Sequence, residues 1–401
     1  MIVVLQSVLW SAVVLLLYAY LIYPIMMTRL FVRNLHNSVS ADKLSVSNES
    51  SQTLSELPTV TVIVAAFNEE QHISARIKNL LAQDYAAARF KILIGSDGSS
   101  DRTVALARDI VDPRVEVHAF LVNRGKASVL NDLVALANTE VLVFTDANTV
   151  FRPDTVRQLV LGLKHTISAT CGDLVLEAPE KGTNQDHQYW NFERKLKLAE
   201  SAIGGLLGAN GGVYAILRQC FLPLRTDTIC DDFVIGMNIA VRGQGLKYVP
   251  SAIAFEDTPN DVMAEYHRRV RIGIGNYQAL FRHPEYIFSG GLALSYTYFS
   301  HKILRWLTPH FLLLIFLSSA LILTMAGDMF YAAIFAIQVL GYTFAYWIFV
   351  TRNRIKWPKI IKAGLFFAVL NVAFLVGFKR FITSDYRGSW RRTERTDIAS
   401  P

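Results

Sequence analysis

Hydrophobic residues are spread unevenly along the chain, and their spacing divides it into segments. Residues 1–28 contain no Asp, Glu, Lys or Arg, and long apolar blocks return after residue 305. Between these ends, short apolar runs such as "TVTVIVAAF" and "VLVFTDA" alternate with stretches of helical spacing such as "EEQHISARIKNLLAQD". Continuous apolar strands that alternate with helices are typical of a mostly parallel sheet covered on both faces. The pattern therefore predicts a Rossmann-like α/β domain over residues 58–284, flanked by hydrophobic helices.

The N-terminal segment, residues 1–28, is long enough to cross a hydrocarbon core of about 30 Å. It has neither a basic start nor a small-residue cleavage site, so we expect a retained transmembrane anchor. Arg29 and Arg33 follow it, and the positive-inside tendency then places the next segment in the cytoplasm. Residues 29–57 are rich in serine and poor in large apolar groups, which predicts a polar linker.

Three apolar blocks follow the α/β domain, over residues 306–327, 329–350 and 363–378. The first two are each long enough to span a membrane. The third has only about sixteen residues, which is short for a span. A re-entrant or interfacial segment is favoured there, because it keeps the basic tail, residues 379–401, on the inner side.

Residues 285–305 precede these blocks and mix aromatic side chains with Lys302 and Arg305. That composition is typical of an amphipathic helix at a membrane surface. His310 and Pro309, near the start of the next block, are interpreted as structural rather than as a proton relay.

Composition agrees with a membrane protein, since hydrophobic residues reach 52% and charged residues only 18%. The net charge of +7 is concentrated after Thr351, where eleven Lys and Arg face three Asp and Glu. A basic flank beside apolar segments indicates a bilayer surface rather than nucleic acid. The three cysteines lack metal-ligand spacing, so free thiols are expected. These features predict a multi-pass protein of the inner (plasma) membrane with a cytoplasmic domain.

Candidate chemistry lies where three predicted strands end in polar residues, at 68–70, 97–101 and 145–148. Ligands of a parallel sheet bind at the carboxyl ends of its strands, so these residues are expected in one cleft. Each stretch taken alone is equally typical of a turn or a helix start.

Asp146 and Asn148 are two oxygen ligands separated by one residue, an arrangement that suits Mg²⁺ or Mn²⁺. Such a cation takes its remaining ligands from water and from a substrate diphosphate. The alternative is an Asx turn that ends the strand.

With these motifs in place, the chain resembles the family-2 glycosyltransferases with the GT-A fold, which include cellulose, chitin and hyaluronan synthases. The segments that carry the resemblance are "AAFNE", "SDGSSDRT", "NRGKASVLND" and "TDAN". The resemblance implies a nucleotide-sugar donor, with Ala66, Phe67 and Glu69 holding the nucleobase and ribose. It also implies that Asp97 contacts the uracil side of the nucleotide and that Lys126 lies beside it.

In the same resemblance, "TDAN" stands where the family carries Asp-x-Asp, so Asp146 and Asn148 are the expected metal ligands. Asn148 replaces the second carboxylate, and the cation would therefore be held by less charge.

The segment "ICDDFVIG" is similar to an acidic pair that places the family's general base at Asp232, with Asp231 beside it. An acceptor hydroxyl must lose its proton as it attacks the anomeric carbon, and a neighbouring carboxylate makes Asp232 a stronger base. An exposed acidic pair at a helix start is the alternative.

Downstream, "HRRVRIGIGNYQ" occupies the place of the Gln-x-x-Arg-Trp motif of processive members, with Ile272 where Trp stands in the family. Arg268, Arg269 and Arg271 are expected to neutralise a leaving diphosphate. A basic helix that touches lipid headgroups is the alternative. Because a flat surface for an acceptor sugar is missing, processive synthesis is less secure than transfer itself.

Two further segments resemble those of membrane-bound relatives. "YWNFERKLKLAES" places Trp190, Glu193 and Lys197 on about one helical face, expected near the acceptor. "GANGGVYAILR" supplies glycines that allow close approach of a sugar to the backbone. Ordinary packing explains either segment almost as well.

The sequence and the resemblance thus predict an inverting membrane glycosyltransferase that uses a UDP-sugar donor and a divalent cation. A growing polysaccharide is the first expected acceptor, and a polyprenyl-linked acceptor that receives one sugar is the second. Few hydrophobic segments are available for a polymer channel, so an export partner subunit or a homo-oligomer is expected. A membrane scaffold that binds nucleotide sugars without turnover is the alternative from another class, although a pure binder has no use for Asp232.

Overall fold

A computed structural model describes residues 1–29, 56–177, 184–257, 262–352, 354–355, 357–384 and 386. Within them, the strands are β1 (Val60–Ala66), β2 (Phe90–Asp97), β3 (Val115–Phe120), β4 (Val141–Asp146), β5 (Thr149–Phe151), β6 (Ala169–Glu177), β7 (Tyr214–Leu217) and β8 (Leu246–Asp257). They form one sheet in the order β3-β2-β1-β4-β7-β6-β8-β5. β1 is parallel to β2 and β4, β2 to β3, and β6 to β8, whereas β7 and β5 run antiparallel to their neighbours. The predicted mostly parallel α/β sheet is confirmed.

Strand β1 shows why polar and apolar residues do not alternate along the central strands. Side chains of a strand point alternately to its two faces, and all seven residues of β1 are buried. Val62 packs on one side with α3 (Ile73–Leu81) and α6 (Thr155–Leu161). Ile63 packs on the other side with α5 (Lys126–Leu136) and α8 (Asp231–Ala240). The sheet is therefore covered on both faces, as expected from its continuous apolar runs.

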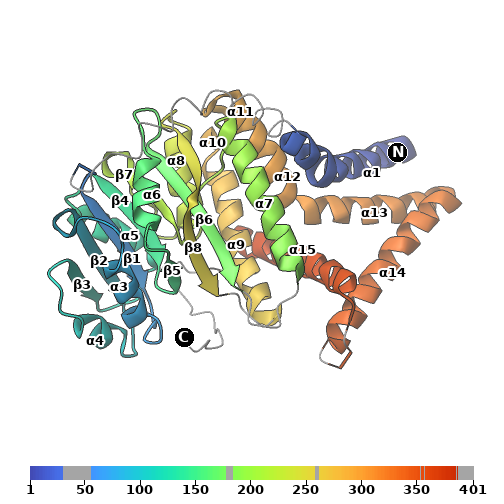
Figure 1. Ribbon diagram of the computed structural model, residues 1–401. Coiled ribbons are helices and arrows are strands. Elements are labelled where there is room, and N and C mark those ends of the chain that lie inside the picture. Colours follow the sequence, from blue (N-terminus) through green and yellow to red (C-terminus); the bar gives the residue numbers. More distant parts are fainter. Residues whose placement is uncertain are drawn as a thin grey trace.

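Four long apolar helices accompany this domain. They are α1 (Ile2–Leu17, continued by a π-helical turn at Tyr18–Ile22), α13 (Thr308–Ala326), α14 (Met329–Thr351) and α15 (Lys359–Ile382). Figure 1 shows α1, α13 and α14 projecting from one side of the sheet domain. Each of the four is long and apolar enough to cross a membrane by length and composition.

The third C-terminal block differs from its expected length. Helix α15 has 24 residues instead of the expected sixteen, because charged residues at both ends, such as Lys362 and Lys379, continue the helix rather than end it. Long cationic side chains can keep their charge in water while their stems lie along apolar surface. The expected length of about sixteen residues, which favoured a re-entrant segment, was therefore wrong.

Helix α15 also packs closely along α9 (Val262–Arg282), a helix of the α/β domain. A Cβ added to Gly377 of α15 would lie 3.0 Å from the carbonyl oxygen of Val270 in α9. Small residues allow two helix backbones to approach in this way. The C-terminal hydrophobic region is therefore attached to the same helix that carries the arginines of the candidate site.

The segment between the domain and α13 is two-sided. It comprises α10 (Glu285–Phe288), α11 (Gly291–Thr297), a π-helical turn (Tyr298–Ile303) and α12 (Leu304–Trp306). Tyr286, Tyr298 and Trp306 are buried against Phe233 of α8. Leu292, in contrast, is 91% exposed. Large apolar side chains of this segment thus pack against α8, and its expected place at a membrane surface stays a prediction.

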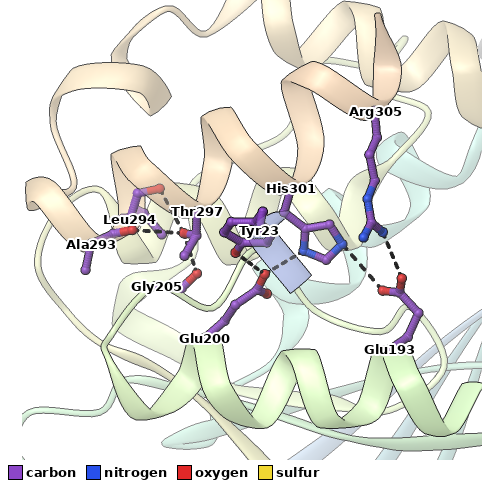
Figure 2. A network of polar contacts seen from close by, with 9 residues as sticks. All are labelled: Tyr23, Glu193, Glu200, Gly205, Ala293, Leu294, Thr297, His301 and Arg305. Carbon is purple, nitrogen blue, oxygen red and sulfur yellow. Dashed lines mark hydrogen bonds and ion pairs between the residues drawn. The ribbon is translucent and has the colours of Figure 1, made fainter. Parts of the chain in front are cut away.

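A buried polar network joins this segment to the N-terminal helix and to α7 (Asn184–Ala202). Figure 2 shows Glu200 of α7 between the hydroxyl of Tyr23, at 2.7 Å, and Nδ1 of His301, at 2.6 Å. Two turns earlier in α7, Glu193 accepts a hydrogen bond of 2.8 Å from Arg305. We call these five side chains the anchor network, because they connect the membrane-proximal helices to the α/β domain.

Candidate active site

A cavity of about 330 Å³ opens at the carboxyl ends of β1 and β4. It confirms that these two strand ends share one cleft, as the parallel topology predicts. Among its lining residues are Phe67, Glu69, Lys126, Asp146, Asn148, Asp231, Asp232, Arg268 and Arg271. Residues remote in the sequence therefore converge on one hollow.

The loop after β1 is held in place by the loop after β2. Asn68 has a left-handed backbone, with φ of 55°, which Asn adopts more readily than most residues. Its side-chain Oδ1 accepts a hydrogen bond of 2.9 Å from the backbone N–H of Ser100. The backbone N–H of Glu69 donates to Oγ1 of Thr103 at 2.7 Å. These bonds fix the backbone that presents Phe67 and Glu69 to the cavity.

Asp97 has a different place from the one expected. Its side chain is fully buried, and it is not among the residues that line the cavity. Its two carboxylate oxygens accept hydrogen bonds from the backbone N–H groups of Arg124 and Gly125, at 2.9 and 2.8 Å. Asp97 therefore shapes the turn that starts α5 rather than facing a nucleotide directly. Ala66, at the end of β1, is likewise buried beneath the cavity floor.

Lys126, the first residue of α5, lies between two carboxylates. Its Nζ is 2.8 Å from Oδ1 of Asp146 and 3.2 Å from Oδ2 of Asp231. Burial by itself lowers the pKa of Lys126, but the two carboxylates outweigh it and hold the pKa above its ordinary value. Lys126 is therefore a permanent positive charge in the cavity wall, beside the expected metal ligand and the acidic pair.

Asp232 lies in the first turn of α8 and faces the cavity. Burial and the negative charge of Asp231 together raise its pKa to about 6, against the opposing charge of Lys126. Its Oδ1 accepts a hydrogen bond of 2.8 Å from the backbone N–H of Phe233. Such a carboxylate is still mostly ionised at neutral pH and binds a proton more strongly than an exposed one, which suits a general base.

The expected cation ligands lie together at the β4–β5 turn. Asp146 and Asn148 both line the cavity, and the Nδ2 of Asn148 donates to Oε1 of Glu256 at 3.3 Å. This bond uses the amide nitrogen and leaves the amide oxygen as the atom that suits a hard cation. In the described part of the chain, no group of three or more His, Cys, Asp and Glu side chains forms a ready-made metal centre. The oxygen donors fit a divalent cation that takes further ligands from a diphosphate.

The three arginines of α9 do not share one position. Arg268 and Arg271 line the cavity, together with Ile272 at the place of the missing tryptophan. Arg269 is instead bonded to Glu265 at 2.5 Å and lies over the ring of Phe366 in α15, 5.9 Å from its centre. The expectation that all three face a leaving group is therefore corrected for Arg269.

On the other side of Asp232, Asn210 forms part of the cavity wall. Its Oδ1 accepts a hydrogen bond from Lys197 of α7, and its backbone N–H lies 3.1 Å from the Sγ of Cys171. A Cβ added to the adjacent Gly211 would lie 3.1 Å from Oδ2 of Asp232, so this stretch approaches the base closely. Lys197 thus supports the wall on which an acceptor is expected.

Of the other two residues expected near the acceptor, Glu193 lies elsewhere. Glu193 is buried in the anchor network and bonded to Arg305. The side chain of Trp190 lies outside the described residues.

Sequence analysis did not identify Glu256 or Asn210 as residues of the site. Glu256 had a recognisable signal, because the apolar run "AIAF" ends in carboxylates just as the runs of β1 and β4 end in polar residues. Asn210 lies in the glycine-rich stretch that was interpreted through its glycines alone. Both residues line the cavity.

Comparison with known proteins gives three findings. Residues 61–222 match the sequence profile of Glycosyl transferase family 2. The chain is 25% identical over 249 residues to a poly-β-1,6-N-acetyl-D-glucosamine synthase from Staphylococcus aureus, a match that covers 60% of each chain. It is 25% identical over 232 residues, 56% of each chain, to the synthase of the same name from Staphylococcus epidermidis. The match thus spans less than two thirds of the length of these relatives.

The structure is similar to that of the mannosyltransferase PcManGT from Pyrobaculum calidifontis in complex with GDP-Man and Mn²⁺. The TM-score is 0.64 at 18% sequence identity, and the likeness covers 90% of this chain and 100% of that one. At this identity the likeness concerns the fold, and it agrees with the expected GT-A arrangement.

Proposed function

We propose that this chain, whose residues 61–222 match the profile of Glycosyl transferase family 2, transfers a sugar from a UDP-linked donor to a growing polysaccharide, with inversion at the anomeric carbon. The observation that carries this proposal is the position of Asp232, a half-buried carboxylate with a pKa near 6 in the cavity that also holds Lys126 and Asp146. The α/β domain would face the cytoplasm, at the inner face of the membrane.

The donor would occupy the cavity with its nucleoside against Phe67 and Glu69. Its diphosphate would lie near Lys126, Arg268 and Arg271, because ammonium and guanidinium groups pair well with phosphate oxygens. Asp146 and Asn148 would hold a divalent cation, Mg²⁺ or Mn²⁺, which when bound supplies charge neutralisation to the leaving diphosphate. Asp97 and Ala66 would act indirectly by shaping the walls of the nucleotide site.

Asp232 would accept the proton of the acceptor hydroxyl. As that proton moves to the carboxylate, the hydroxyl oxygen forms a bond to the anomeric carbon, and the bond from this carbon to the diphosphate oxygen breaks. Attack from the face opposite the diphosphate inverts the anomeric centre. Asp231 would support this step through its negative charge, which increases the proton affinity of Asp232.

A polysaccharide acceptor is supported by the relatives, which are named as poly-β-1,6-N-acetyl-D-glucosamine synthases. Four helices that are long and apolar enough to cross a membrane support a reaction next to a bilayer. They are few for a channel that accommodates a polymer, so we include an export partner or a second copy of this chain in the proposal.

The test uses the full-length protein in detergent or lipid nanodiscs with a panel of UDP- and GDP-sugars and Mg²⁺ or Mn²⁺. We expect release of nucleoside diphosphate from one donor and a ladder of product masses that differ by one sugar. If the product is instead a polyprenyl-linked acceptor with one added sugar, the acceptor is the lipid-linked one and not a growing polysaccharide. No diphosphate release with any donor, in protein that melts cooperatively, would contradict the proposal.

A further inference from the structure

We propose that Glu256 supplies the second carboxylate of the cation site, in place of the acid that Asn148 does not provide. This inference rests on the proposed function, because it concerns the cation that the donor diphosphate would share. It adds a residue from β8 to a site that the sequence motif confines to the end of β4.

The sheet brings Glu256 to this position. β5 pairs antiparallel with β8, and Thr149 of β5 lies directly opposite Glu256 of β8. Asn148 immediately precedes Thr149, so its side chain meets that of Glu256 across the two strands. The two side chains are in contact, with 3.3 Å between Nδ2 of Asn148 and Oε1 of Glu256. Both side chains line the same cavity as Asp146.

The chemistry of these three side chains favours a hard divalent cation. Carboxylate and amide oxygens are its preferred protein ligands, and the charge of the ligand set tunes its affinity. Lys126 already offsets part of the negative charge of Asp146, at 2.8 Å. A site with Asp146 as its single acid would therefore attract a cation weakly, whereas Glu256 restores a second negative charge. Its bond to Asn148 also orients the amide so that the oxygen remains available to a cation.

A different role for Glu256 must be separated from this one. Burial lowers the pKa of Arg268, but Glu265 and, to a smaller extent, the charge of Glu256 outweigh this effect and raise it. In that role Glu256 would hold Arg268 and affect a diphosphate rather than a cation. Glu265 offers a matched control, since it is bonded to Arg268 at 2.8 Å and is not among the residues that line the cavity.

The experiment measures Mn²⁺ binding to the full-length protein in detergent with saturating UDP, from the electron paramagnetic resonance signal of free Mn²⁺. We expect Glu256→Gln to weaken Mn²⁺ binding at least about tenfold, the lower end of what loss of even an outer-shell partner costs a metal site. Glu256→Asp keeps the negative charge but shortens the side chain by one methylene group, so it should also weaken Mn²⁺ binding. Glu265→Gln should leave Mn²⁺ affinity unchanged.

A rescue makes the test specific. In the double variant Asn148→Asp with Glu256→Gln, the second carboxylate moves from β8 to the β4–β5 turn, and Mn²⁺ affinity should return to within about threefold of the starting protein. A residue needed only for folding would not be rescued by an acid placed elsewhere. UDP binding and the melting temperature of each variant show whether it is folded.

Three outcomes would overturn the inference. Unchanged Mn²⁺ affinity in Glu256→Gln would remove Glu256 from the site and leave the proposed transfer reaction intact. Equal weakening in the Glu256→Gln and Glu265→Gln variants would assign Glu256 to Arg268. Protein that transfers sugar without binding Mn²⁺ would exclude the cation site but not the transferase, whereas protein that neither binds UDP nor transfers sugar would contradict the proposed function itself.

Discussion

Two groups of buried charged side chains differ in how their charges are balanced. In the cavity, Lys126 lies between Asp146 and Asp231, and Asp232 adds a third carboxylate. We call these four side chains the cavity cluster. In the anchor network, the two glutamates are matched by Arg305, His301 and the hydroxyl of Tyr23. One group therefore carries excess negative charge at an open hollow, and the other is internally matched.

One acid of each group, Asp232 in the cavity cluster and Glu193 in the anchor network, has a shifted pKa, and the two shifts are in opposite directions. Burial and a neighbouring carboxylate raise the pKa of Asp232 to about 6. Burial also raises the pKa of Glu193, but the hydrogen bond and charges of His301 and Arg305 reverse this and hold it well below its ordinary value. A buried acid that is matched stays ionised and stabilises a contact, whereas an incompletely matched acid is available for proton transfer. The difference assigns catalysis to the cavity cluster and attachment to the anchor network.

The largest expected effect comes from removing the proton acceptor of the cavity cluster. Asp232→Asn keeps the size of the side chain and its bond to Phe233, but the amide cannot accept the proton. Loss of a general base typically costs about 10²- to 10⁴-fold in rate. We expect kcat to fall by this amount, while donor binding and melting temperature stay near their starting values. Turnover within threefold of the starting protein would remove Asp232 from its role.

A substitution in the anchor network should lower stability rather than turnover. Glu200→Leu removes the buried partner of Nδ1 of His301 and of the hydroxyl of Tyr23. Removing one member of a buried charged pair typically costs about 3–5 kcal/mol. We therefore expect a lower melting temperature in detergent and a smaller folded yield, with kcat per folded molecule within about threefold. A stable variant with normal yield but no turnover would place the network in the chemistry and end the distinction.

The cleft itself was predictable because polar residues follow apolar runs at the ends of parallel strands. This rule brought Glu69 and Asp146 together correctly. It gave the wrong orientation for Asp97, since a carboxylate at a strand end can also turn toward the backbone N–H groups of the next loop. That choice depends on the path of a loop that contributes no periodic signal. Glu256 was missed because its strand reaches the site only through the antiparallel pairing of β8 with β5.

Helical periodicity contained more information about α9 than was used. Residues three apart lie on the same face of a helix, and a residue one position away is rotated by about 100°. Arg268 and Arg271 were therefore able to face the cavity together, whereas Arg269 belonged to a different face. The anchor network was not predictable in this way, because it joins helices that are separated by more than 100 residues in the sequence.

A smaller effect is expected in the pH dependence of the cavity cluster. Asp232 acts as a base only when it is ionised, so kcat/KM should fall as the pH drops through about 6. Asp231→Asn removes a negative neighbour, which lowers the pKa of Asp232 and moves this acid limb to lower pH. Lys126→Met removes a positive neighbour and should move it to higher pH. Initial rates between pH 5 and 8 give the profile.

Shifts of the acid limb in the same direction for these two variants would contradict the electrostatic account of the cavity cluster. As a control, Glu193→Gln alters the anchor network alone and should leave the acid limb where it is. The profile thus tests whether the two groups are electrically separate.

The smallest effect on activity is expected from substitution of Arg269, which allows the same comparison to be made within one helix, α9. Arg269 is bonded to Glu265 and lies over Phe366 of α15, so it resembles the anchor network in being matched and directed away from the cavity. Arg269→Ala should change kcat/KM for the donor less than about twofold, because Arg269 does not line the cavity in which the diphosphate would bind. Arg271→Ala, on the cavity side of the same helix, should lower kcat/KM about tenfold, as expected for a lost charged hydrogen bond. Equal losses of kcat/KM in the two variants would show that Arg269 and Arg271 do not differ in donor binding. The distinction between charges that are matched by a partner and charges that serve the reaction would then not hold for α9.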